Sequence, residues 1–330
     1  MKLSTAKYTV LLMITCGILF LYHSCKKKED PVKYKFGLFP ENLVNLYELN
    51  NKLTNNTSEY VIEGSIPIVF PSSGGLEQGA IYYRFDQTTG DIELAFEKTN
   101  DVFTQMLIDK AGTQGAIYAP YRFFCKSDGY EYFIFSAENT NGNLDFFYMK
   151  NRPIFVGTSY PEILGPYPVN LLNSTANDAY LSFNNNFDTA YFSSDRNGYF
   201  DIYIQSFLPE GSLSDQLDKP FVVSEKLDNV NNNNANDKCP FFHKNVMVFA
   251  SDRLGGLGEF DIYYSVLKNG KWSTPTYFGP GINTEFDEYN PILGSVANFK
   301  NSYLIFSSNR PGGKEEFDLY FTGIDLSKLE

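Results

Sequence analysis

The chain of 330 residues contains few of the residues that most often carry chemistry, with two His, four Cys and one Trp. The cysteines form no C-x-x-C pair and have no partnering His cluster, which argues against a metal site built on them. Basic residues are also in the minority, because 27 Lys and Arg face 39 Asp and Glu for a net charge of −12. Nucleic-acid binding needs a basic surface, so we expect no nucleic-acid partner.

The four cysteines divide into two groups. Cys16 and Cys25 lie in an N-terminal leader, whereas Cys125 and Cys239 each lie in an apolar run that resembles a strand. A free cysteine in such a run behaves as a small hydrophobic residue. We therefore expect Cys125 and Cys239 to be buried free thiols.

Aromatic and turn-forming residues are abundant. The sequence contains 24 Tyr, 30 Phe, 25 Gly and 16 Pro. Aromatic side chains suit half-buried strands, and closely spaced Gly, Pro, Asn and Asp supply turns. This composition predicts an all-β fold with short strands.

A repeated motif organises the chain. Residues 249–253 read FASDR and are followed by DIYY at 261–264. Further copies read FSSDR with DIY, FSSNR with DLY and, in a degenerate form, FSAEN with DFF. Their leading residues are Phe135, Phe192, Phe249 and Phe306, and a fifth, more degenerate copy is led by Phe70. A fixed period of this kind is typical of repeat architectures.

Each copy has the pattern of one propeller blade. A strand, a loop and a second strand are followed in the fourth copy by Asn269-Gly270, a strong hairpin signal. Asn-rich segments at 173–178, 231–237 and 283–287 then lead into the innermost strand of the next copy. Four strands per unit predict a five-bladed β-propeller of four-stranded antiparallel blades. Because an open edge would leave backbone groups unpaired, we expect Phe36–Tyr60 to supply the outer strand that closes the ring.

The N-terminus has the pattern of an export signal. Residues 8–22 are almost wholly apolar but too few to span a bilayer comfortably. A small residue before Cys25 resembles a bacterial lipobox, and the charged residues after it resemble those of Bacteroidetes lipoproteins. The resemblance implies a signal peptide at 1–24, a lipid on Cys25, a tether at 25–35 and a propeller at 36–330. A plain cleaved signal or an uncleaved anchor is the alternative.

The string SDRLGGLGEFDIY at 251–263 resembles the WD-repeat-like propeller repeats of the TolB type. The resemblance covers most of residues 60–324 and is most specific in the last three copies. It implies a propeller fold, a cell-envelope setting and binding in preference to catalysis.

Residues that recur in copy after copy are expected to be structural, since catalysis seldom needs one residue in several blades. Their Ser and Asp side chains are expected to accept hydrogen bonds from loop N–H groups, and their Arg side chains to bridge carbonyls or the Asp of the DIY strand. These residues are Asp195, Arg196, Asp201, Asp252, Arg253, Asp261, Arg310 and Asp318.

The acids that enter the innermost strands are the best candidates for a site. Asp178, Asp237, Asp287 and Glu285 are expected to gather around one mouth of the channel, where their oxygens would bind Ca²⁺ or sugar hydroxyls. The alternative is that each Asp caps its own turn. No metal other than this Ca²⁺ is suggested by the sequence.

Catalytic alternatives have less support. Five-bladed propellers include glycoside hydrolases, which use a carboxylate pair, and Asp237 with Glu285 is the pair on offer. His243 would serve a Ser/His/Asp triad, or be a simple strand-edge residue. Trp272, Tyr199 and Tyr289 would stack on sugars, anchor a partner or pack between blades. We assign no catalytic residue.

The sequence thus predicts a lipid-anchored envelope propeller that binds or scaffolds a protein partner in an outer-membrane assembly. It would face the periplasm or the cell surface. Glycan binding or glycoside hydrolysis at the channel mouth is the alternative function.

Overall fold

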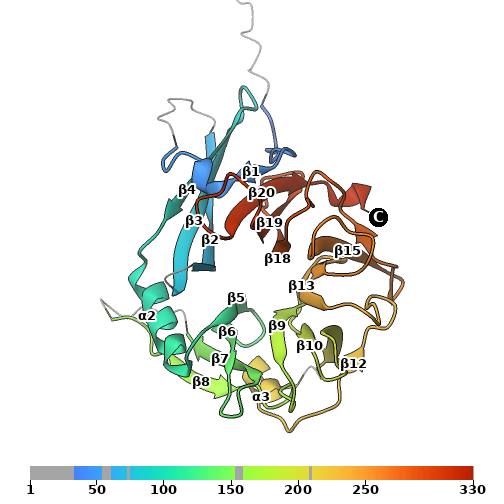
Figure 1. Ribbon diagram of the computed structural model, residues 1–330. Coiled ribbons are helices and arrows are strands. Elements are labelled where there is room, and N and C mark those ends of the chain that lie inside the picture. The colour runs from blue at the N-terminus through green and yellow to red at the C-terminus, as the bar shows by residue number, and fades with distance from the viewer. Residues whose placement is uncertain (1–32, 54–60, 73–74, 153–158, 208–209, 330) are drawn as a thin grey trace, which may run out of the picture.

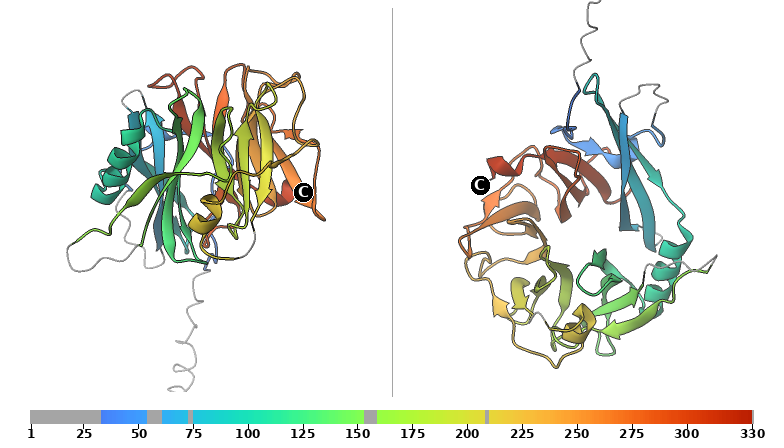
Figure 2. Two further views of the ribbon diagram at one scale, coloured as in Figure 1. Left: turned by 90° about the horizontal axis from the view of Figure 1, so that it is seen from below. Right: turned by 180° about the vertical axis from the view of Figure 1, so that it is seen from behind.

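The computed structural model describes residues 33–53, 61–72, 75–152, 159–207 and 210–329. Five antiparallel sheets stand around a central axis like the blades of a propeller (Figure 1). In the side view the strands run roughly along this axis (Figure 2). The predicted all-β, five-bladed propeller is confirmed. The predicted signal peptide, Cys25 and most of the tether lie outside the described residues.

The blades are numbered in chain order. Blade 1 contains β2 (Val61–Ser72), β3 (Gly75–Asp86) and β4 (Ile92–Lys98). Blade 2 contains β5 (Tyr118–Cys125), β6 (Tyr130–Glu138), β7 (Leu144–Asn151) and β8 (Leu164–Pro168). Blade 3 contains β9 (Asp178–Phe183), β10 (Thr189–Ser194), β11 (Asp201–Ser206) and β12 (Glu225–Lys226). Among the described residues blade 1 has three strands, one fewer than blades 2 and 3.

Blade 4 contains β13 (Asp237–His243), β14 (Val246–Ser251), β15 (Asp261–Lys268) and β17 (Thr276–Tyr277), and β16 (Lys271–Trp272) forms a hairpin with β15. Asn269 and Gly270 form the turn of this hairpin, with φ angles of 52° and 74°. These left-handed conformations are the ones that an Asn-Gly hairpin turn requires.

Blade 5 closes the ring. It contains β18 (Glu288–Ser295), β19 (Ser302–Ser308) and β20 (Asp318–Ile324), and its outer strand is β1 (Val44–Asn45). Val44 pairs with Phe321 and Asn45 with Tyr320 in antiparallel register. The expectation that the segment before blade 1 supplies the closing strand is therefore confirmed.

Short helices occupy the connections. The segment for which the sequence left strand or helix open forms α2 (Val102–Ala111), which starts where the Asp101 side chain accepts a hydrogen bond from the Thr104 N–H. Phe103 and Leu107 of α2 pack in one cluster with Phe133 of blade 2. The other short helices are α3 (Leu213–Leu217), η1 (Leu46–Glu48), η2 (Gly112–Gln114) and η3 (Leu326–Lys328). None of the helices in the described part of the chain is long and apolar enough to cross a membrane.

The leading Phe residues of the last four repeats occupy equivalent positions. Phe135, Phe192, Phe249 and Phe306 lie on the second strands of blades 2–5 and are buried. Phe70 lies instead on β2, the first strand of its blade. The alignment of Phe70 with Phe249 is therefore wrong by one strand. The degenerate copy has lost the Ser-Asp-Arg, and its Gly75 and Leu76 begin β3, the second strand of blade 1.

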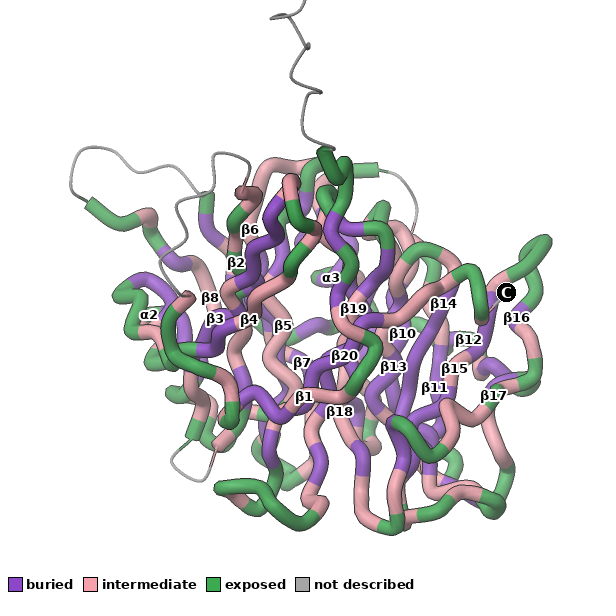
Figure 3. Tube along the Cα trace, turned by 90° about the horizontal axis from the view of Figure 1, so that it is seen from above, coloured by how far each residue is buried: buried purple, intermediate pink, exposed green. Residues whose placement is uncertain are grey.

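The core lies mainly between adjacent blades. Phe146 of blade 2 makes an edge-to-face contact with Phe192 of blade 3 at 5.6 Å, and Tyr191 of blade 3 stacks on Phe242 of blade 4 at 5.2 Å. Buried positions follow the strands, whereas exposed positions gather at the loops (Figure 3). Each blade thus buries its faces against its neighbours, as a closed ring requires.

Candidate functional site

The recurring Arg of each repeat is held inside its blade. The guanidinium of Arg253 lies over the rings of Phe249 and Tyr263, at 5.1 and 4.8 Å. Its Nε donates to the Ser251 hydroxyl at 2.9 Å, and its Nη2 donates to the carbonyl of Val230 at 3.0 Å. The equivalent contacts are made by Arg196 and Arg310. A group enclosed in this way is unavailable to a ligand.

The carboxylate partner of each Arg comes from the innermost strand. Arg196 binds Asp178 at 2.6 Å, Arg253 binds Asp237, and Arg310 binds Glu288 at 2.8 Å. Asp178, Asp237 and Glu288 are fully buried. The expected alternative partner, the Asp of the DIY strand, is not the one that these Arg side chains bind.

Asp237 illustrates the double role of these acids. One oxygen accepts from Arg253, and the other accepts from the N–H of Asn232 at 2.7 Å, which fixes the turn before β13. Burial raises the pKa of Asp237 above its usual range, and the neighbouring Arg253 opposes this effect. Asp178 makes the same pair of contacts, with Arg196 and the N–H of Ser174. The geometry of both acids is that of turn caps.

The other two candidate acids, Asp287 and Glu285, are not arranged as a ligand site either. Asp287 accepts a hydrogen bond from the Phe260 N–H at 2.9 Å, just as Asn236 accepts one from Phe200 at 3.1 Å. Asp287 therefore joins two blades. Glu285 is exposed in the turn before β18. Among the described residues no group of three or more His, Cys, Asp and Glu is placed to hold a metal, so the Ca²⁺ site remains a prediction.

The remaining repeat acids organise loops and strand ends. Asp252 accepts two hydrogen bonds from Asn236, and Asp195 accepts the equivalent two from Asn177. Asp201 binds Lys226 at 2.8 Å. The other two DIY-strand acids accept from loop N–H groups, and these are Asp261 and Asp318.

His243 and Trp272 have structural surroundings. The Nε2 of His243 lies 2.5 Å from the Ser295 hydroxyl, and burial lowers the pKa of His243 to about 4. No described carboxylate hydrogen-bonds to this imidazole, so the triad alternative lacks its third member. Trp272 is buried against Tyr191 and Phe242, which is the expected packing between blades.

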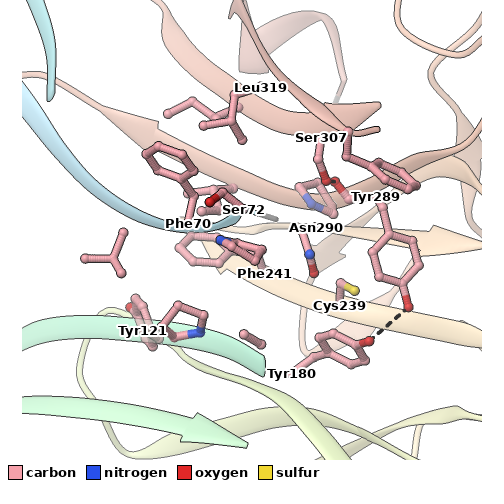
Figure 4. A pocket seen from close by; sticks show the side chains of 18 of the residues that line it. Phe70, Ser72, Tyr121, Tyr180, Cys239, Phe241, Tyr289, Asn290, Ser307 and Leu319 are labelled. Atoms are coloured by element: carbon pink, nitrogen blue, oxygen red, sulfur yellow. Dashed lines mark hydrogen bonds between the residues drawn. The ribbon is translucent and has the colours of Figure 1, made fainter. Parts of the chain in front are cut away.

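A cavity of about 410 Å³ lies at the centre of the ring. Residues from all five innermost strands line it, among them Phe70, Tyr121, Tyr180, Phe241 and Tyr289 (Figure 4). Its walls are mostly apolar and aromatic, with a few polar groups, which is the usual character of a small-molecule site. None of the four acids predicted from the sequence lines this cavity.

Strained backbone shapes the cavity wall. Ala119, Tyr180, Cys239 and Asn290 have φ angles of 47°, 61°, 57° and 49°, and each lies on the innermost strand of its blade. The strand pairing shifts at each of these four places, as at a β-bulge. Bulges redirect side chains, and a left-handed residue other than Gly is an uncommon, costly conformation. Four blades therefore repeat the same distortion where their residues line the cavity.

A neutral polar cluster lies on one wall. The Tyr289 hydroxyl donates to the Tyr180 hydroxyl at 3.1 Å. Burial raises the pKa of the Cys239 thiol to about 12 and also raises the pKa values of both tyrosines. These groups therefore stay protonated at neutral pH, so the thiol is a poor nucleophile.

The cavity lacks the carboxylate pair of a glycoside hydrolase. Its only described acidic lining residues are Glu315 and Glu316, which are adjacent on the loop before β20. Hydrolases place their two carboxylates on opposite sides of the sugar. The lining thus suits binding better than hydrolysis.

Sequence reasoning missed the bulged wall residues, although a signal was present. Pro120, Pro240 and Pro291 each follow a bulged residue directly. Proline within a strand occurs at edges and bulges, because it cannot donate a backbone hydrogen bond. Three prolines in otherwise apolar runs therefore marked the channel wall.

Comparisons with known proteins find similarity in three dimensions only. No protein-family model matches the chain, and neither does any curated protein. The "putative TolB" of Agrobacterium tumefaciens is similar with 12% identity, a TM-score of 0.40 and coverage of 84% of this chain and 81% of that one. An alpha-L-arabinofuranosidase from Lactobacillus brevis has 11% identity, a TM-score of 0.43 and coverages of 78% and 89%.

A third solved structure has a similar degree of likeness. The GH43_1 enzyme from Xanthomonas citri has 12% identity, a TM-score of 0.42 and coverages of 85% and 90%. Likeness at this level carries no information on the chemistry of the site. The class that the sheets themselves define is a five-bladed β-propeller.

Proposed function

We propose that this propeller is a binding module of the cell envelope, anchored through Cys25, which holds a protein partner on one face of the ring. The observation that carries the proposal is a set of exposed apolar side chains on equivalent loops. Leu254 and Leu257 are 101% and 54% exposed, and Tyr199 and Phe317 are 46% and 38% exposed. All four belong to loops that join the second and third strands of blades 3–5.

Equivalent loops of a propeller lie on the same face, because every blade has the same strand order. Exposed apolar patches mark interaction sites, and we propose that the side chains of these loops form such a patch. The hydroxyl groups of a sugar need hydrogen-bonding partners, and the side chains of Leu254 and Leu257 offer none. A protein surface is therefore a better partner than a glycan for this face, which we call the loop face.

The envelope setting rests on the sequence of the leader. A lipid on Cys25 would hold the propeller at a membrane through the tether that precedes residue 36. A single acyl-bearing anchor concentrates a weak binding module near partners in the same membrane. We propose the outer membrane, where such a module would serve as a scaffold.

Site-specific photo-crosslinking in cells tests the proposal. A photoreactive residue placed at Leu254 or Leu257 should give a discrete protein adduct. Phe124 provides the matched control, because it is 46% exposed at the end of β5, on the opposite face. We expect an adduct from the loop face and none from Phe124.

Two outcomes contradict the proposal. Absence of an adduct at both leucines would show that no protein partner binds the loop face. Equal adducts from both faces would indicate non-specific contact. Release of sugars from envelope polysaccharide by the purified protein, with no adduct in cells, would favour the glycan alternative.

A further inference from the structure

We propose that the central cavity binds a small amphipathic cation, with an aromatic or alkyl body inside the cavity and an ammonium group at its rim. This inference goes beyond the protein-binding role of the loop face. It rests on the lining of the cavity, to which Phe317 of the loop face contributes but Leu254, Leu257 and Tyr199 do not.

The walls favour an apolar body. Phe70, Tyr121, Phe241 and Tyr289 come from four different blades, and their side chains face the same space (Figure 4). Tyr121 and Phe241 are in edge-to-face contact at 5.6 Å. Aromatic faces carry negative potential, so they also attract a cation.

The charged side chains that line the cavity are acidic. Among the described lining residues there is no Lys, Arg or His, whereas Glu315 and Glu316 both contribute. Glu316 is exposed, and Glu315 lies 3.7 Å from Lys98. Carboxylates beside low-dielectric walls raise the local concentration of cations and exclude anions.

Two lysines lie beside these glutamates. The Lys98 ammonium pairs with Glu315 and lies 5.5 Å from the ring centre of Tyr47, a lining residue, and Lys314 donates to the Tyr47 carbonyl at 2.7 Å. Among the described residues no ion pair involves Glu316, so Glu316 is the carboxylate that we assign to the ligand.

Lys238 of β13 lies outside the lining, and its ammonium lies 4.5 Å from the Phe200 ring centre and 5.3 Å from that of Phe260. The aromatic walls belong to the innermost strands, whereas Glu315 and Glu316 belong to the loop before β20. A ligand with one apolar body and one ammonium group matches both.

Two polar groups in the wall add selectivity. Burial raises the pKa of Tyr121, whose hydroxyl therefore remains a donor at neutral pH. The Asn290 side chain also faces the cavity (Figure 4). A volume of about 410 Å³ is in the range of small-molecule sites, so the ligand is a small molecule rather than a folded partner.

Calorimetric titration with three probes of similar shape tests the proposal. Phenethylamine carries a positive charge, phenethyl alcohol is neutral and phenylacetate is negative. We expect phenethylamine to bind about tenfold more tightly than the alcohol, because the ring faces and rim carboxylates add to its affinity. Phenylacetate should bind most weakly, and added salt should weaken the binding of the amine.

Matched variants locate the site. Glu316→Gln should weaken the binding of phenethylamine about two- to fivefold, as expected for an exposed ion pair. Glu259→Gln is the control, because Glu259 precedes Phe260 in blade 4 as Glu316 precedes Phe317 in blade 5, but does not line the cavity. Phe241→Leu should weaken the amine while retaining the fold.

The proposal is overturned by any of three results. These are the absence of phenethylamine binding at millimolar concentration, equal or tighter binding of phenylacetate, and equal effects of E316Q and E259Q. Crosslinking from Leu254 and Leu257, which do not line the cavity, does not depend on any of these results, so failure of one proposal leaves the other standing.

Discussion

The guanidinium of Arg253 lies against two aromatic rings, a buried carboxylate and a backbone carbonyl, and Arg196 and Arg310 repeat the arrangement. A buried ion pair of this kind gains little over an apolar substitute but is costly to break. These contacts explain why Ser, Asp and Arg recur in the blades. They hold the innermost strand to the rest of each blade.

Replacement of Arg253 by Met should destabilise the protein strongly, by about 3–5 kcal/mol, because Asp237 would remain buried without its partner. Urea unfolding measures the change. The double variant R253M/D237N should recover part of the loss, since its buried group is neutral. A loss below about 1 kcal/mol for R253M, or no recovery in the double variant, would contradict this account.

The sequence predicted a structural role for these residues, but it did not predict the carboxylate that each Arg binds. Recurrence of the Arg in three blades indicated a structural unit. It did not reveal that the carboxylate comes from Asp178, Asp237 or Glu288, because each acid lies at the start of the innermost strand, well before the motif. Two of these acids, Asp178 and Asp237, were therefore candidates for a ligand site, whereas Glu288 was not among the leading candidates.

At the scale of elements, the segment from Gly37 to Leu49 fastens the ring. Phe39 is fully buried and stacks on Phe299 with ring centroids 3.7 Å apart. It also contacts Tyr83 of blade 1 edge to face, at 6.0 Å. The segment thus packs against blades 1 and 5 at the place where the ring closes.

Replacement of Phe39 by Ala should lower the free energy of unfolding by about 3–5 kcal/mol, as for other fully buried Phe residues. Phe36→Ala is the matched control, because Phe36 is 37% exposed three residues earlier. The control should change stability by less than about 0.5 kcal/mol. Similar unfolding midpoints for the two variants would show that Phe39 does not fasten the ring.

Most elements followed from the period of the repeat and from the need to close the ring. The hairpin at Asn269-Gly270 and the closing strand β1 are examples. The α2 segment was ambiguous, because a short apolar run does not distinguish strand from helix. Phe70 was misaligned, because the first copy has lost the Ser-Asp-Arg that fixes the register elsewhere.

At the scale of the whole molecule, the cavity is the feature that the sequence did not predict. Its walls combine residues as distant as Phe70 and Tyr289, which meet only after all five blades assemble. Four blades share the bulge that shapes the cavity wall, whereas the side chains that face the cavity differ from blade to blade. Blade 1 contributes Phe70, which lies on another strand than the repeated Phe, and blade 5 contributes Glu316, whose counterpart Glu259 in blade 4 does not line the cavity.

Arg253 and Leu254 are neighbours in one loop but have different roles. Arg253 stabilises blade 4, whereas Leu254 is fully exposed and belongs to the proposed binding face. The most direct test is the double variant L254S/L257S, with the photoreactive residue moved to Tyr199. It should change the free energy of unfolding by less than about 0.5 kcal/mol and abolish the protein adduct. A stable variant that still forms the adduct would contradict the central claim that this face binds the partner.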